Sequence, residues 1–332
     1  MCSCLCRFRP ARISPERSAD ADCRPARRTR SAQAAGLRQR GNPGGRRHAD
    51  RHERSGEQGL RAAPVTGKLE AEYRLADSVL WYLSVSRGVK SGGFTAYNAI
   101  SASTVNAFKP ENLWAYETGV KSDLFDGSLR LNASLFYYDY RNQQVQSAIY
   151  TQEYGVIGAI VNADRSHLYG GELEAEWHPL AALTITQNFG YKTGKFDKFS
   201  DFLDTSASIS AGDTVYKSLK GKKVGFPPIS YSGAISYRLQ AGDYVLEPQL
   251  DYVFHDKRTP LLLGDTYDID AYWLANASLT IIPQDGPWEM TIYGRNIFDT
   301  KYDLERNYFI SNVNIAMRGE PASYGVRLKY RY

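Results

Sequence analysis

Residues 129–137 read Leu-Arg-Leu-Asn-Ala-Ser-Leu-Phe-Tyr, with an apolar side chain at every odd position. Successive side chains of a β-strand point to opposite faces, so this period of two predicts a strand with one apolar face. The same period recurs along the chain in residues 69–75, 79–85, 173–177 and 324–332. These stretches predict an all-β body built from long strands.

The connections between these strands alternate in length. Short turns are expected at 76–78, 125–128, 178–182, 240–243 and 283–287, and longer loops at 91–111, 147–158, 196–222, 258–268 and 301–322. Asp126-Gly127 and Gly242-Asp243 provide suitable turn chemistry. Tight turns at one end and long loops at the other are typical of outer-membrane barrels.

The predicted fold is therefore a transmembrane antiparallel β-barrel fragment, an up-and-down meander of about eleven strands. Strands of about 10–14 residues exceed the usual 5–6 and suit a tilted membrane crossing. Four tryptophans near strand ends fit interfacial girdles: Trp81, Trp177, Trp273 and Trp288. A large soluble β-sheet is the alternative. No apolar window is long enough for a membrane helix.

The first 64 residues differ in composition from the rest. They hold fifteen Arg, no Lys and six acidic residues, together with all four Cys, whereas all 24 Tyr and five Trp lie in residues 65–332. The sequence therefore divides into 1–64, an Arg-rich segment expected to be disordered, and 65–332, a mildly acidic β body.

Three interpretations compete for residues 1–64. Cys2, Cys4, Cys6 and Cys23 could bind a metal with His48 and His52, but the spacing fits zinc sites poorly. An arginine-rich arm could bind nucleic acid phosphates, although no nucleic-acid module follows it. Arg without Lys, with abundant Ala, Gly and Pro, is also what a GC-rich coding strand yields in the wrong frame. We favour this off-frame interpretation.

Five stretches of the body resemble TonB-dependent outer-membrane receptors. They are Val85–Phe94, Glu111–Lys121, Tyr169–Glu174, Gly294–Tyr302 and Gly319–Tyr332, in the family's order. The positions that match the family's motifs are Gly92, Gly93, Phe94, Glu117, Glu172, Asn296, Tyr302, Gly319 and Pro321. Ala322 departs from the pattern, because Arg often follows Gly-Glu-Pro in the family.

The resemblance implies the C-terminal half of a barrel of about 22 strands whose lumen holds a plug. Such a receptor lies in the outer membrane of a Gram-negative bacterium and imports a scarce ligand, most often a ferric siderophore, with energy from TonB. Tyr324, Tyr330 and the closing Tyr332 would be the signal read by the barrel-assembly machinery. Because residues 1–64 resemble neither plug, TonB-engaging segment nor export signal, we expect a fragment that is non-functional on its own.

Candidate ligand residues lie in the predicted loops. Tyr97, Tyr150, Tyr154 and Tyr216 could stack on a catecholate or a sugar. Lys217, Lys220, Lys222 and Lys223 could attract an anionic ferric complex. The alternative for each is an ordinary solvated loop residue.

No pattern in the sequence indicates catalysis, a cofactor or a metal site. Glu172, Glu174 and Glu176 share one face of one strand, as lumen-facing residues would. His167, His178 and His255 lie apart, without metal-binding spacing. A transport receptor is therefore expected, and a passive porin or a barrel enzyme is the alternative.

Overall fold

The computed structural model describes residues 65–95, 104–259, 268–310 and 313–331. The chain separates into two units, Met1–Glu57 and Gln58–Tyr332, and the first lies outside the described residues. The expectations for residues 1–64, Tyr97 and Tyr332 therefore concern parts of the chain that the structure does not describe.

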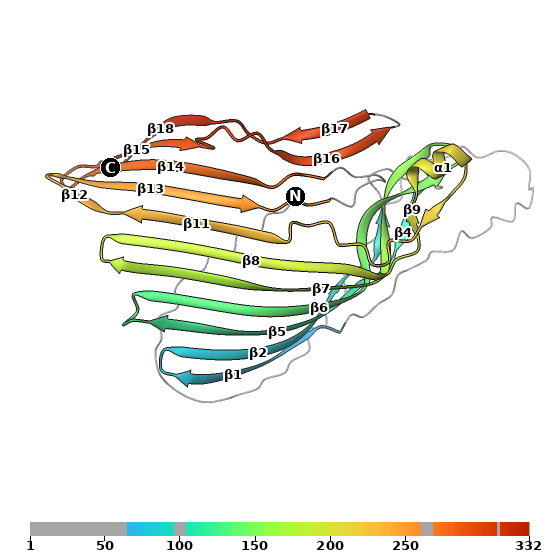
Figure 1. The fold of residues 1–332 in the computed structure, drawn as a ribbon, viewed down its shortest axis with the longest axis horizontal. Coiled ribbons are helices and arrows are strands. Elements are labelled where there is room, and N and C mark those ends of the chain that lie inside the picture. Colours follow the sequence, from blue (N-terminus) through green and yellow to red (C-terminus); the bar gives the residue numbers. More distant parts are fainter. Residues whose placement is uncertain (1–64, 96–103, 260–267, 311–312, 332) are drawn as a thin grey trace, which may run out of the picture. The chain divides into compact units, whose positions relative to one another are not determined.

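The second unit is built on a 12-stranded antiparallel sheet (Figure 1). Each strand pairs with its neighbours in sequence order, which confirms the predicted meander. The strands are β1 (Gly67–Ala76), β2 (Val79–Lys90), β5 (Glu111–Leu124), β6 (Leu129–Thr151), β7 (Gly155–Leu180), β8 (Leu183–Lys198), β11 (Ile229–Tyr237), β13 (Tyr244–His255), β14 (Tyr272–Pro283), β15 (Trp288–Arg295) and β18 (Ser323–Tyr330). The short β12 (Leu239–Ala241) pairs with β13.

Short turns join the strands at one end of the sheet, and longer connections join them at the other. The predicted loop at 147–158 is wrong, because β6 and β7 continue through it and leave only residues 152–154 as a turn. β5 pairs with β6 only as far as Arg141, whereas β6 pairs with β7 as far as Thr151. This hairpin thus extends beyond the sheet on the side of the long connections.

The long connections contain small elements of their own. Residues between β2 and β5 form β3 (Gly93–Thr95) and β4 (Asn106–Phe108), which pair with each other. Between β8 and β11 lie β9 (Phe202–Leu203), α1 (Thr205–Ala211) and β10 (Tyr216–Lys217). Between β15 and β18, β16 (Asp303–Ile310) pairs with β17 (Val313–Arg318).

The register divides the main sheet into an apolar face and a polar face. Cross-strand partners Leu83, Thr118, Leu135 and Gly171 follow one another on the apolar face. On the polar face, Ser84 pairs with Glu117, Glu117 with Phe136, and Phe136 with Gly170. Glu172 lies on the same face, two residues after Gly170. The alternation read from residues 129–137 therefore continues from strand to strand.

The apolar face is widely exposed. Leu69 is 80% exposed, Leu135 65% and Leu328 70%, and these residues lie on the first, a central and the last strand. An exposed apolar surface that extends across a whole sheet is unfavourable in water and favourable against lipid. Within the described residues, no helix is long and apolar enough to span a bilayer.

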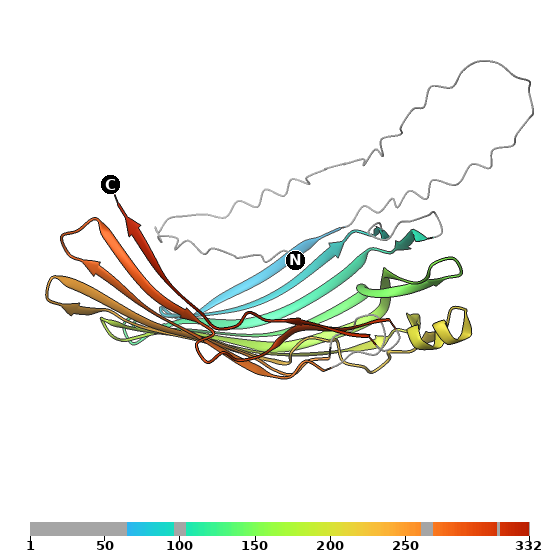
Figure 2. The same cartoon turned by 90° about the horizontal axis from the view of Figure 1, so that it is seen from above.

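The sheet ends at two unpaired edges, β1 and β18 (Figure 2). In the part of the chain that the structure describes, these strands do not pair with each other, so the barrel is not closed. Unpaired edge groups in hydrocarbon each cost several kcal/mol, about 2–7, so a stable membrane form requires partners for both edges.

A buried apolar cluster lies beside the long connections rather than within the sheet. It comprises Ala163, Phe196, Phe199, Phe202 and Leu219. The Phe196 and Phe199 rings are 5.1 Å apart, and the Phe199 and Phe202 rings 5.5 Å. This cluster fixes β9 and the following connection against the extended β6–β7 hairpin.

Candidate functional site

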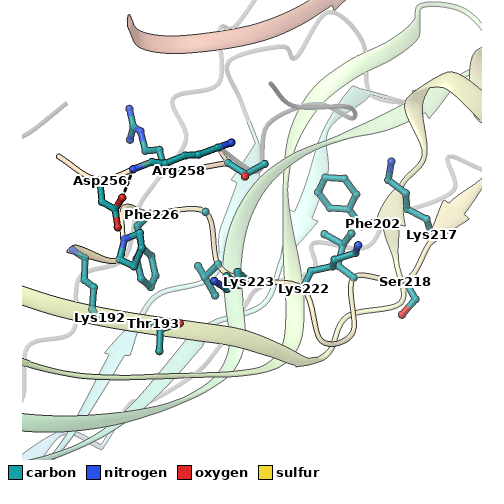
Figure 3. A pocket seen from close by; sticks show the side chains of 16 residues that line it. Lys192, Thr193, Phe202, Lys217, Ser218, Lys222, Lys223, Phe226, Asp256 and Arg258 are labelled. Carbon is teal, nitrogen blue, oxygen red and sulfur yellow. Dashed lines mark hydrogen bonds between the residues drawn. The ribbon is translucent and has the colours of Figure 1, made fainter. Parts of the chain in front are cut away.

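A basic pocket opens where β8 meets the connection to β11 (Figure 3). Its volume is about 840 Å³. Lys192 and Thr193 line it from β8, Lys217 from β10, and Lys222, Lys223 and Phe226 from the following connection. Asp256, Lys257 and Arg258 line it from the chain just after β13. Three segments distant in sequence therefore contribute cations to one cavity.

Backbone hydrogen bonds hold the connection along the outer end of β8. Phe196 N donates to Lys222 O at 3.1 Å, Gly221 N to Phe196 O at 2.7 Å, and Val224 N to Gly194 O at 3.0 Å. Gly221 has φ of +77°, a left-handed conformation that glycine adopts readily. Leu219, just before this turn, packs into the phenylalanine cluster. The lysines at 222 and 223 are thus placed by an apolar anchor and a tight turn.

Three of the pocket lysines have no carboxylate partner in the part of the chain that the structure describes. Among the described residues, Lys192, Lys222 and Lys223 form no ion pair within 4.0 Å. Lys192 Nζ lies 5.2 Å from the centre of the Phe226 ring, and the two residues are neighbours in Figure 3. Aromatic faces attract cations, so this contact positions the ammonium without neutralising it.

Other pocket cations are partly neutralised. Lys257 Nζ lies 2.6 Å from Asp268 Oδ2, and Thr259 Oγ1 donates to Asp268 Oδ1 at 2.6 Å. The hydrogen bond between Lys257 and Asp268 raises the pKa of Lys257 and is the main cause that lowers the pKa of Asp268. Lys217 Nζ lies 3.7 Å from Asp204 Oδ2. The pocket keeps an excess of positive charge, which suits an anion.

The motif residues near the end of β15 form a hydrogen-bonded turn. Asn296 is 5% exposed and has φ of +46°. Its Nδ2 donates to Thr300 O at 3.0 Å and to Glu320 O at 3.1 Å, and its Oδ1 accepts from Thr300 N at 2.9 Å. Asp299 Oδ1 accepts from Ala322 N at 2.9 Å. This turn ties the start of the β15–β18 connection to its end.

Close contacts explain two of the motif glycines. A Cβ at Gly319 would lie 2.0 Å from the Tyr302 ring, and one at Gly92 would lie 2.6 Å from Phe108 O. Tyr302 also packs against Tyr272, with ring centres 4.6 Å apart and the rings tilted by 31°. Glycine is therefore required at both positions by close packing rather than by positive φ.

The remaining motif positions lie on the sheet surface or next to it. Glu117 Oε1 accepts from the Tyr82 hydroxyl at 2.6 Å on the polar face. Glu172 is exposed on that face, Gly93 approaches Phe108, and Phe94 and Pro321 are exposed. Tyr324 and Tyr330 are exposed on the edge strand β18.

Residues 34–297 match the family model described as "TonB dependent receptor-like, beta-barrel". The chain belongs to this family. The match begins within the Arg-rich segment and ends before β16, whereas the sheet itself continues to β18.

Solved structures of this family share the fold of the chain. The ferric yersiniabactin uptake receptor FyuA from Yersinia pestis is 20% identical, with a TM-score of 0.62, and the match covers 79% of this chain and 36% of FyuA. The siderophore receptor PiuA from Acinetobacter baumannii is 17% identical with a TM-score of 0.59, covering 79% and 35%. The copper transporter OprC is 15% identical with a TM-score of 0.54, covering 80% and 39%. The chain thus spans somewhat over a third of each structure.

The structure brings together only some of the ligand-binding residues that the sequence of this chain predicts. Lys217, Lys222 and Lys223 line the basic pocket, but Lys220 and Tyr216 do not, although both are exposed. Tyr150 and Tyr154 lie at the tip of the β6–β7 hairpin, where Gln152 Nε2 donates to Gly212 O at 2.9 Å. They therefore lie beside α1 and outside the pocket lining.

Sequence analysis missed most of the residues that line the pocket, among them Lys192, Phe226, Lys257 and Arg258. Each of these four lies in the outer half of a strand or in a connection between strands, and this position is the signal that the sequence offers. Their convergence depends on the meander, which sequence spacing does not give. Within the described residues, no group of three or more His, Cys, Asp or Glu is placed to hold a metal ion.

Proposed function

We propose that this chain forms part of the barrel wall of an outer-membrane receptor that imports an anionic metal chelate of the ferric siderophore class. The observation that carries this proposal is the basic pocket, in which Lys192, Lys222 and Lys223 lack carboxylate partners among the described residues. The family assignment and the named activities of FyuA, PiuA and OprC support transport of metal complexes as the activity class.

The position of Lys192 supports a ligand that reaches the polar side of the barrel wall. Lys192 pairs in register with Gly170, which belongs to the polar face. A cavity of about 840 Å³ falls within the usual size of small-molecule sites, about 300–1,000 Å³. Phe202 and Phe226 add apolar surface beside the cations, which suits a chelate with aromatic arms.

The proposed receptor would have further partners. TonB would supply energy through sequence outside the β body, and the barrel-assembly machinery would recognise the strand that carries Tyr324 and Tyr330. Lipid would cover the apolar face, and the two sheet edges would pair with other strands of a closed barrel.

Binding can be tested on the full chain purified in non-ionic detergent. Equilibrium dialysis with a radiolabelled anionic ferric tris-catecholate should show binding that weakens as salt rises, because salt screens the lysines. Two charges about 6 Å from an anion contribute about 0.7 kcal/mol each in water. Lys222→Gln/Lys223→Gln should therefore weaken binding about tenfold.

A matched control removes two lysines outside the pocket lining. Lys198→Gln/Lys301→Gln makes the same charge change and should bind as the unaltered chain does, since Lys198 pairs with Asp164 and Lys301 with Asp299. Equal losses in both variants would contradict a specific site. Equal binding of a cationic ferric trihydroxamate would contradict selection of anions.

A further inference from the structure

A second group of cations lies on the apolar face of the sheet and adjoins the pocket, because its member Lys195 pairs in register with the pocket residue Lys223. The basic row, as we call it, comprises Arg87, Arg141, Arg165 and Lys195 from β2, β6, β7 and β8. Arg87 pairs in register with Trp114, Trp114 with Asp139, Asp139 with His167, and His167 with Lys195. Arg141 and Arg165 pair with each other one step further toward the long connections. The row therefore extends over five neighbouring strands, of which β5 contributes Trp114 and the other four contribute cations.

An aromatic row lies immediately next to it on the same face. Tyr116 pairs with Tyr137, and Tyr137 pairs with Tyr169. On each strand the tyrosine lies two residues nearer the middle of the sheet than the residue that belongs to the basic row's line of partners, which are Trp114, Asp139 and His167. All three tyrosines are more than 40% exposed. The His167 ring stacks between the last two, with ring centres 6.2 Å from each. Exposed tyrosines on a lipid-facing sheet mark the height of the membrane interface.

The basic row retains free donors and excess charge. Asp139 accepts from both arginines, with Arg141 Nη2 at 3.3 Å and Arg165 Nε at 3.2 Å. Both arginine side chains remain about half exposed, at 51% and 46%. Asp197 lies 2.8 Å from His167 Nδ1 and 3.8 Å from Arg165. Four cations thus face two carboxylates.

Two further contacts leave the ends of the row available. Lys195 is exposed and forms no ion pair within the described residues. The Arg87 guanidinium lies 5.7 Å from the Trp114 ring centre, a cation–π contact that leaves its charge in place. The row is therefore anchored by aromatic rings and shared carboxylates without being neutralised.

We propose that the basic row binds the phosphate groups of an anionic lipid at the interface on the long-connection side of the membrane. Arginine forks suit phosphate oxygens, and cations next to an interfacial aromatic belt meet lipid headgroups at the correct depth. A soluble anion is less well suited, because the adjoining surface is apolar and suits acyl chains. This inference rests on the proposed membrane location of the apolar face.

Native mass spectrometry of the full chain in non-ionic detergent can test the proposal. The chain should retain dioleoylphosphatidylglycerol in preference to zwitterionic dioleoylphosphatidylcholine. Each basic residue at a membrane surface contributes enough to change affinity severalfold, and Asp139 offsets part of this. Arg141→Gln/Arg165→Gln should therefore reduce retention of the anionic lipid about tenfold.

The control makes the same charge change on the polar face. Arg295 and Arg327 both lie near the Tyr293 ring there, so Arg295→Gln/Arg327→Gln should retain lipid as the unaltered chain does. Equal losses in both variants, equal retention of the two lipids, or displacement of the lipid by millimolar inorganic phosphate would overturn the proposal.

Folding and membrane location are followed separately. Heat-dependent migration in gels and membrane fractionation report insertion, so failure of the proposed location is distinguished from failure of lipid binding. If the double arginine variant does not insert, Lys195→Gln replaces it, because no ion pair is lost there within the described residues. That variant should retain about threefold less anionic lipid, and unchanged retention would overturn the proposal.

Discussion

Replacement of Asn296 by alanine should destabilise the end of β15 strongly. The side chain makes three hydrogen bonds within 3.1 Å and is almost fully buried. Each bond contributes about 0.5–1.5 kcal/mol net, which gives about 3 kcal/mol in total. Asparagine also tolerates the left-handed φ of +46° better than alanine, which adds about 1 kcal/mol. The expected loss is therefore about 4 kcal/mol.

Urea unfolding of the full chain in detergent, followed by tryptophan fluorescence, would measure this loss. Two controls separate its causes. Asn296→Asp keeps the acceptor for Thr300 N and the left-handed preference but loses both donations, so it should lose about half as much. Asn188→Ala removes only one long contact, to Ser232 Oγ at 3.5 Å, and should change the free energy of unfolding by less than about 1 kcal/mol. A loss below about 1 kcal/mol for Asn296→Ala would refute the assigned role of the turn.

Three further predictions concern the faces, the motif packing and the pocket. Leu135→Arg places a charge on the lipid face and should cost about 2–4 kcal/mol of insertion free energy, whereas the neighbouring Ser134→Arg on the polar face should insert normally in a liposome-folding assay. Gly319→Ala should cost about 1–3 kcal/mol in urea unfolding, because its Cβ would meet the Tyr302 ring, and Gly319→Ala/Tyr302→Ala should lose less than the sum of the single variants. Asp268→Asn should strengthen binding of the ferric tris-catecholate about two- to threefold by freeing Lys257. Because the folded pKa of Asp268 is lowered, its ion pair is present above the ordinary carboxyl pKa and is lost as pH falls through the lowered value. Wild-type binding should therefore approach that of Asp268→Asn in acid, and an unchanged ratio between them would contradict the pairing.

Period-two alternation was sufficient to predict most of the sheet. Because a strand's side chains alternate strictly, Leu129 to Tyr137 specified both the strand and its apolar face. The pair Asp126-Gly127 was enough to predict the turn that joins this strand to the preceding one. In the structure both residues have positive φ. The sequence did not predict the extension of the β6–β7 hairpin. Residues 147–158 are extended because the two strands pair with each other there, and their local sequence pattern does not indicate a strand.

Polar residues on the apolar face could not be interpreted from sequence either. Gln187 lies opposite Gly233, and its Oε1 accepts from the hydroxyls of Tyr231 and Tyr252, the latter at 2.8 Å. Strands β11 and β13 thus supply the hydroxyl donors that satisfy the amide oxygen of Gln187 on the apolar face. A Cβ at Gly233 would lie 2.6 Å from the Tyr252 hydroxyl, so the glycine makes room for this contact.

The sequence by itself determined the strand content, the order of the strands, the two faces and the family motifs, because these follow from local alternation and from turn residues. Tertiary structure alone decided which cations meet. Lys192, Lys222 and Arg258 lie far apart in sequence and line one pocket, whereas Lys220, within the same lysine-rich stretch, does not. Register across neighbouring strands sets these distances, and it depends on pairing between segments that no local pattern specifies.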